Sequence, residues 1–132
     1  MSWRWITKSA LLILHDESLA LHGGGAGIRD EGLLDSALAR PENVLAYANP
    51  DAAPDAATLA ASYAIGLAKN HAFVDGNKRA ALLSVGLFLY LNQYRLIVSQ
   101  AEATLTMLAV ASGDITEDEF AAWLRQNIVK KP

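Results

Sequence analysis

The sequence predicts an all-α protein, a compact bundle of about six helices with one buried central helix. Two apolar segments, "TLAASYAIGLA" and "AALLSVGLFLYL", have the length of helices and contain no charged residue. Helix-start patterns, a Ser or Thr followed three positions later by Glu, recur in the C-terminal half. Alternation of apolar and polar residues is nowhere sustained, so no sheet of any size is expected.

Composition bounds the class of protein. The 132 residues, 52% hydrophobic and 19% charged, predict one globular domain over 1–132 with a real core, and argue against disorder. A net charge of −3 without a basic stripe argues against nucleic acid as a direct partner. The absence of Cys excludes a disulfide framework and a thiolate metal site, and suits a cytoplasmic protein.

Neither end of the chain nor its interior predicts contact with a membrane. The longest apolar run, 80–91, is shorter than the ~20 residues that a bilayer requires. The opening "MSWRWITKS" lacks the apolar centre and small-residue cleavage site of a signal peptide. We therefore expect a cytoplasmic location and no membrane partner.

The first helices are delimited by glycine, a capping residue and proline. A helix over 7–21 is expected to end at the glycines 23–25. Asp30 is the expected N-cap of a second helix. That helix is expected to end near Arg40, because a residue that precedes proline is disfavoured in the helical region and Pro41 follows.

The middle of the chain combines a loop with the two most apolar helices. A possible helical turn at 44–47 leads into a loop that contains Pro50 and Pro54. Helices over 58–70 and 76–92 follow. The second of them is apolar on all sides, so we expect it to be the central helix, packed on every face.

The last two helices are predicted from capping boxes. Segments 99–110 and 116–126 each begin with Ser or Thr and carry Glu three positions later. The segment 94–100, "YRLIVSQ", can form a short extended piece between helices.

The stretch "KNHAFVDGNKRAALLS", 69–84, places many polar residues between the two most apolar helices. Burying them is costly unless each finds a partner. His71 follows Ala60, Ala64 and Leu67 at helical spacing, so we expect it to end an apolar stripe that points inward. Two interpretations remain open at this point, a core histidine and a general base.

The residues after His71 favour an anion site. Phe73 can anchor the turn in the core, and Gly76 permits a tight turn before the next helix. The first amides of a helix lack partners, and the helix dipole is positive at that end, which suits phosphate. Lys78 and Arg79 add two cations at the end where cations disfavour the helix, which points to an anionic ligand.

Asp75 has two possible roles, N-cap of the fourth helix or ligand of a divalent cation. Mg²⁺ commonly binds through one or two carboxylates together with substrate phosphates. The stretch therefore offers a candidate base, a metal ligand and an anion site, which is the set that phosphoryl or nucleotidyl transfer needs.

The segment "HAFVDGNKR" resembles the H-x-F-x-D-x-N-K-R signature of the Doc (death-on-curing) toxins, a branch of the Fic/Doc superfamily. The segment "LHDESLALHGGGAGIRDEGLLDSALARP" is similar to the N-terminal part of Doc proteins, so the resemblance covers nearly the whole chain. It implies a Fic/Doc-type bundle of about six helices and a toxin of a type II toxin–antitoxin pair.

The resemblance also implies a reaction. Doc toxins are understood to transfer the terminal phosphate of ATP to a protein hydroxyl, with elongation factor Tu as a target. Fic proteins carry a second Gly after the Asn and mostly transfer AMP. Lys78 stands at that position here and would crowd the pocket, which favours the kinase. An AMP transferase and a non-catalytic binding module of the same fold remain as alternatives.

Carried over by position, the resemblance makes His71 the base and Asp75 the Mg²⁺ ligand. It assigns phosphate binding to Gly76, Asn77, Lys78 and Arg79. It further implies ATP as co-substrate and a Phd-like antitoxin whose C-terminal segment folds into an apolar groove.

Other segments are predicted to have lesser roles. The glycine-rich 23–30 lacks the ending of a phosphate loop and follows a helix, so we interpret it as an interhelical turn, with Arg29 in a salt bridge. His15 is interpreted as solvated or structural. The loop 47–55 is our candidate for a mobile segment near the site that docks the target.

Overall fold

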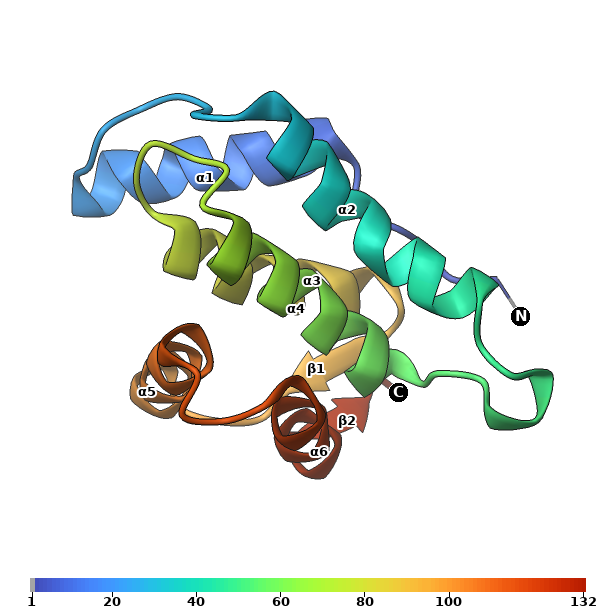
Figure 1. Cartoon of the computed structure of the whole chain (residues 1–132). Coiled ribbons are helices and arrows are strands. Elements are labelled where there is room, and N and C mark those ends of the chain that lie inside the picture. The colour runs from blue at the N-terminus through green and yellow to red at the C-terminus, as the bar shows by residue number, and fades with distance from the viewer. Residues whose placement is uncertain (1) are drawn as a thin grey trace.

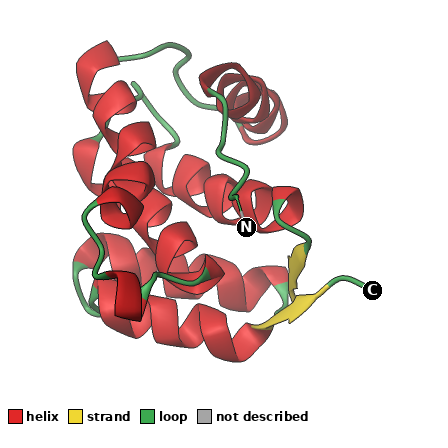
Figure 2. Ribbon diagram, turned by 90° about the vertical axis from the view of Figure 1, so that its right-hand side faces the viewer, coloured by secondary structure: helices red, strands yellow, loops and turns green. Residues whose placement is uncertain are grey.

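The computed structural model describes residues 2–132, which fold into six α-helices and one small antiparallel sheet (Figures 1 and 2). The all-α prediction with about six helices is confirmed. The elements in chain order are α1 (Lys8–His22), α2 (Glu31–Ala46), the 3-10 helix η1 (Pro50–Ala52), α3 (Ala56–Asn70), α4 (Asn77–Leu91), β1 (Tyr94–Leu96), α5 (Gln100–Ser112), α6 (Glu117–Asn127) and β2 (Ile128–Lys130).

The central helix of the bundle is α3, with α2, α4, α5 and α6 packed around it (Figure 1). Eleven of its 15 residues are buried, and most of these eleven are Ala, Ser or Gly. Small side chains let neighbours approach closely: a Cβ on Gly66 would lie 3.2 Å from the Cα of Ala37 in α2. The prediction that segment 76–92 is the central helix is therefore wrong.

The helix α4 is buried on one face only. Ala81, Val85 and Phe88 lie in the core. The opposite face carries Leu87, which is half-buried, and Tyr90, which is 64% exposed. A helix that is apolar on all sides can be packed on every face or can leave one apolar face open to solvent. The helix α4 leaves one apolar face open.

The helix α2 continues past Pro41, although we expected it to end near Arg40. Pro41 is buried inside the helix and leaves the carbonyl of residue 37 without its usual donor. Arg40 holds this turn in place, because its guanidinium donates to both carboxylate oxygens of Glu117 at 2.7 and 2.8 Å and to Ser62 Oγ at 3.0 Å. Packing against α3 and this ion pair outweigh a proline penalty of ~3 kcal/mol.

The capping predictions hold in part. Asp30 caps α2 by accepting from the N–H of Leu33, as predicted, and the capping box that opens α6 is complete. The box predicted to open α5 is only half formed, because the carboxylate of Glu102 accepts from Trp123 Nε1 at 3.2 Å instead of returning to the cap. The helix α3 starts two residues earlier than predicted, because Asp55 caps it.

The small sheet ties the C-terminal strand to the chain between α4 and α5 (Figure 2). Strand β1 lies inside the predicted extended segment 94–100, and it pairs with β2 in the register Tyr94↔Lys130 and Leu96↔Ile128. The second strand was not predicted, since three residues are too few to show a period of two. None of the helices over residues 2–132 is long and apolar enough to span a bilayer.

Candidate active site

The junction between α3 and α4 lies against the connection between α1 and α2 (Figure 1). An isolated antiparallel bridge joins Ile28 to Phe73, and the N–H of Val74 donates to the carbonyl of Gly27 at 3.1 Å. The glycine-rich connection 23–30, which we expected to be a simple interhelical turn, therefore forms one wall of the candidate site.

His71 is exposed and does not end an inward-pointing stripe, so that prediction and the core-histidine interpretation are both wrong. The helix α3 ends at Asn70, and His71 is its C-cap in the left-handed conformation, with φ 52° and ψ 47°. This conformation usually falls to Gly and costs other residues ~1–2 kcal/mol. It turns the imidazole away from the core and toward solvent. A general base in that position can reach a substrate.

Arg29 supports this helix end from the neighbouring connection. Its Nε donates to the carbonyl of His71 at 2.6 Å, and its Nη2 donates to that of Asn70 at 3.1 Å. The salt bridge predicted for Arg29 is not formed with any residue of 2–132; helix carbonyls take its place.

Phe73 and His15 form the floor of the junction. Phe73 is buried, and its ring stacks on that of His15 with centroids 3.8 Å apart. His15 is only 2% exposed, and its Nε2 lies 2.8 Å from the carbonyl of Asp75. Because a carbonyl only accepts, Nε2 carries the hydrogen. His15 is thus structural, one of the two interpretations left open.

Asp75 does not cap α4; Gly76 occupies the N-cap position. The carboxylate is exposed, with Oδ1 accepting from the N–H of Gly76 at 2.7 Å and Oδ2 lying 3.4 Å from the N–H of Gly25. Gly76 has φ +76°, and a Cβ there would lie 3.2 Å from His15 Nε2. Both the backbone angle and the close approach call for glycine at this position.

The side chain of Asn77 closes the turn. Its Oδ1 accepts from the N–H of Phe73 at 2.9 Å, and its Nδ2 donates to the carbonyl of the same residue at 3.0 Å. The side-chain amide is therefore engaged with the backbone of Phe73, and the backbone N–H of Asn77 donates to no described residue.

The N-terminus of α4 is open. The backbone N–H groups of Asn77, Lys78 and Arg79 meet no acceptor within residues 2–132. The other five α-helices of the described chain each have a side-chain N-cap. Lys78 and Arg79 are exposed and form no ion pair with a described residue. Three free amides, a positive helix dipole and two cations are the features that favour binding of an anion.

The donor set near this site fits a magnesium ion that is held largely by its substrate. No cluster of three or more His, Asp or Glu exists in the part of the chain that the structure describes. Asp75 offers one exposed carboxylate with unused lone pairs, and Mg²⁺ takes one or two carboxylates when phosphates and water complete its shell.

A groove of about 1130 Å³ starts at Lys78 and Arg79 and runs between α1, α4 and α5. Its polar lining residues also include Glu17 and His22. The open apolar face of α4 forms its floor. Most of its lining is apolar and includes Leu14, Leu21, Leu82, Leu87, Met107 and Leu108.

The loop 47–55 lies far from the site, contrary to our expectation. It precedes α3, while His71 follows it, and a helix of 15 residues is roughly 22 Å long (Figure 1). The segment beside the site is the connection 23–30 instead.

Sequence reasoning missed the support given by His15 and Arg29. For His15 a signal existed, since it stands four residues from both Leu11 and Leu19, and all three are buried on one face of α1. The close approach of the connection 23–30 to the junction explains why glycine is needed there. A Cβ on Gly24 would lie 2.9 Å from Asp75 Oδ2. Nothing local indicated the contact of Arg29 with a helix end 41 residues away.

Comparison with known proteins agrees with this geometry. The chain matches the profile of the Fic/DOC family over residues 5–89, which include the whole junction. It is 34% identical over 123 residues to the protein kinase doc of Escherichia phage P1, covering 93% of this chain and 94% of that protein. It is 41% identical over 106 residues to the toxin Doc of Mycolicibacterium smegmatis, covering 77% of this chain and 78% of that protein. The chain therefore belongs to the Fic/Doc family, among its Doc toxins.

Proposed function

We propose that this toxin is a kinase that transfers the γ-phosphate of ATP to a Ser or Thr hydroxyl of elongation factor Tu or a similar translation factor. The observation that carries the proposal is the open N-terminus of α4, with Lys78 and Arg79 on its first turn and His71 and Asp75 beside it. The 34% identity to a protein named as a kinase supports the same reaction.

The phosphates of ATP would accept from the free N–H groups of Asn77 to Arg79 and pair with the two cations of that turn. This relieves the repulsion between Lys78 and the helix dipole, so the anion and the helix end stabilise each other. Asp75 would hold Mg²⁺, which neutralises phosphate charge when it is bound. The arrangement orients the nucleotide, and most catalysis of phosphoryl transfer is orientation and charge stabilisation.

His71 would be the general base. Its exposure lets it reach a hydroxyl on another protein, which a buried histidine could not do. The imidazole accepts the hydroxyl proton as the oxygen bonds to the γ-phosphorus; the bond from that phosphorus to the bridging oxygen breaks, and ADP leaves. General-base help of this kind contributes ~10²–10⁴ in rate.

The product distinguishes this reaction from AMP transfer. The protein is incubated with ATP, Mg²⁺ and purified elongation factor Tu, and the intact mass of the target is measured. We expect a gain of about 80 Da for one phosphate, whereas AMP would add about 329 Da. An AMP-sized adduct would overturn the kinase assignment. Lys78→Gly should weaken or redirect the transfer, because it removes both bulk and charge beside the phosphates.

The groove is the proposed site for an antitoxin of the Phd kind. An apolar channel with cations at one end suits an amphipathic helix whose acidic residues face Lys78 and Arg79. We expect the complex to have a Kd of nanomolar order, roughly −12 kcal/mol, and to be formed in the cytoplasm, where the target is. Co-expression with a neighbouring antitoxin reading frame should restore growth; no rescue and no copurifying peptide would count against the pairing.

A further inference from the structure

We propose that Arg29 is a positioning residue, whose guanidinium holds the backbone of His71 in the left-handed conformation that presents the imidazole to solvent. The conformational part of this inference stands on the geometry of the α3 C-terminus. Its consequence for the reaction rate rests on the proposed function.

Arg29 is the donor to three successive carbonyls at the end of α3. Its Nη2 donates to Asn70 at 3.1 Å, its Nε to His71 at 2.6 Å, and its backbone N–H to Ala72 at 2.7 Å. Carbonyls at a helix C-terminus lack intrahelical partners and lie at the negative end of the dipole. The planar guanidinium, with several donors in a fixed fork, satisfies the carbonyls of Asn70 and His71 together, which the single ammonium of a lysine cannot do in the same geometry.

Two further contacts connect the end of α3 to the start of α2, beside Arg29. Asp30, the next residue, is the N-cap of α2, and its N–H also donates to the carbonyl of Ala72 at 3.0 Å. On the other side of the contact, the side chain of Asn70 donates to the carbonyl of Leu33 in α2 at 3.1 Å. The start of α2 is thus a frame from which Arg29 reaches the end of α3.

The imidazole of His71 takes part in no hydrogen bond within the described residues, so its position depends on its backbone. The anion site is held by other contacts, namely those of Asn77 with Phe73 and of His15 with Asp75. Loss of Arg29 should therefore displace the base and leave the phosphate site in place. A displacement of about 1 Å in a reacting group can cost ~10² in rate.

The test compares Arg29→Ala and Arg29→Lys with Arg125→Ala, a matched control. Arg125 also donates a guanidinium fork, but to Asp55 at the opposite end of α3. The conformational readout is the NMR intraresidue cross-peak between the amide and α protons of His71, which is unusually strong when φ is positive. We expect it to weaken in Arg29→Ala and to be unchanged in Arg125→Ala.

The kinetic readout is the rate of phosphate transfer by the same variants. For Arg29→Ala we expect kcat to fall ~10²-fold with the KM for ATP changed by less than about twofold, and Arg29→Lys to recover part of the loss. An unchanged His71 cross-peak in Arg29→Ala would overturn the inference, whatever the activity. A wild-type protein that transfers no phosphate would overturn the proposed function while the cross-peak still decides the role of Arg29. A loss confined to KM would also contradict positioning of the base.

Discussion

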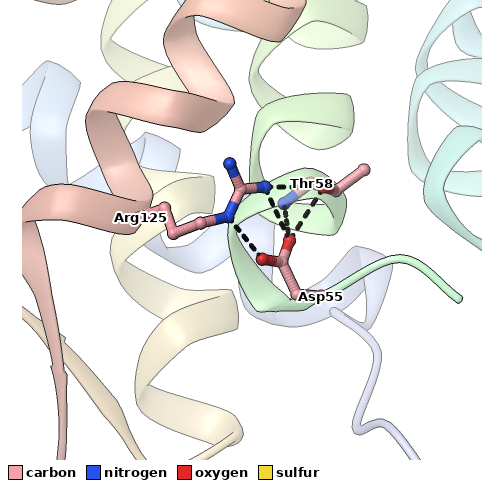
Figure 3. A network of polar contacts seen from close by, with 3 residues as sticks. All are labelled: Asp55, Thr58 and Arg125. Carbon is pink, nitrogen blue, oxygen red and sulfur yellow. Dashed lines mark hydrogen bonds and ion pairs between the residues drawn. The ribbon is translucent and has the colours of Figure 1, made fainter. Parts of the chain in front are cut away.

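The N-termini of α3 and α4 present the same backbone chemistry in two different states. At α3, Asp55 accepts from the N–H of Thr58 at 2.9 Å and from its hydroxyl at 2.8 Å, and Arg125 donates to the same carboxylate at 2.6 and 3.1 Å (Figure 3). At α4 the N-cap is Gly76, which has no side chain to offer, and the first turn carries cations instead of a carboxylate.

The difference lies in where the anion comes from. The guanidinium of Arg125 holds the pKa of Asp55 well below its usual range, with help from the hydrogen bonds of Thr58, so α3 has a permanent anion of its own. The end of α4 has the same positive dipole, and no anion from residues 2–132 lies within hydrogen-bond reach of its free amides. The N-terminus of α3 is thus neutralised by its own chain, whereas the N-terminus of α4 stays open, as the proposed phosphate site requires.

The largest expected effect is at the open end. His71→Ala should lower the rate of phosphate transfer by ~10²–10⁴ while the protein still folds, because the base is exposed and supports no other residue. The matched change at the closed end, Thr58→Ala, removes hydrogen bonds to Asp55 and Arg125 and should leave the rate unchanged. A His71→Ala protein that modifies its target at the normal rate would show that the base is another residue.

Lys78→Glu should change function and stability in opposite directions. The affinity for ATP is expected to fall about 10- to 100-fold, since a charge-assisted contact worth ~1.5–3 kcal/mol is replaced by repulsion. The free energy of unfolding should rise by ~0.3–1 kcal/mol, because a carboxylate on the first turn favours the helix dipole. Nucleotide titration and denaturant unfolding measure the two quantities. If affinity and stability fell together, the comparison of the two helix ends would fail.

At the closed end the expected effect is on stability alone. Asp55→Ala removes an N-cap and should lower the free energy of unfolding by ~1–2 kcal/mol, with the transfer rate unchanged. Asp55→Asn keeps a capping acceptor and loses the charge, so its loss should be smaller. A tenfold drop in activity in either variant would mean that the α3 end also serves the reaction.

The smallest expected effect is the pH dependence of the closed end. Because the folded-state pKa of Asp55 lies below its unfolded value of about 3.9, its contribution to stability is fully present above that value and is lost as pH falls toward the folded pKa. The stability difference between wild type and Asp55→Asn should be constant from about pH 5 to 8 and shrink below about pH 4. The pair is half exposed, so the charge contribution should not exceed about 1 kcal/mol. A difference that grew on acidification would contradict this sign.

Local signals predicted the helices well, because capping and apolar runs are properties of neighbouring residues. Asp30 and Thr116 cap as predicted, and each predicted helix is present. The error at Pro41 has a non-local cause, since the contact of Arg40 with Glu117 spans 77 residues. The central helix was misassigned because small residues, which allow the closest packing, are less hydrophobic than the leucines that line the open groove.

The sequence predicted which segment forms the candidate site, but not how its side chains are arranged in space. The spacing of "HAFVDGNKR" indicated a base beside an anion site. In the structure the imidazole of His71 and the first amides of α4 are both free of hydrogen bonds to residues 2–132. The direction of His71 could not be predicted, because it depends on a left-handed residue at a helix end whose carbonyls contact Arg29. Likewise, the position of Asp75 depends on His15, which is 60 residues away.

The most direct test of the open helix end is an NMR titration of the labelled protein with ATP and Mg²⁺, followed at single backbone amides. We expect the amide signals of Asn77, Lys78 and Arg79 to shift together as the nucleotide binds. The amides of Ala57 and Thr58, at the closed end of α3, are the internal control and should not move. If the amide signals of the α4 first turn do not shift while ATP binds, or if ATP does not bind, the N-terminus of α4 is not a phosphate site.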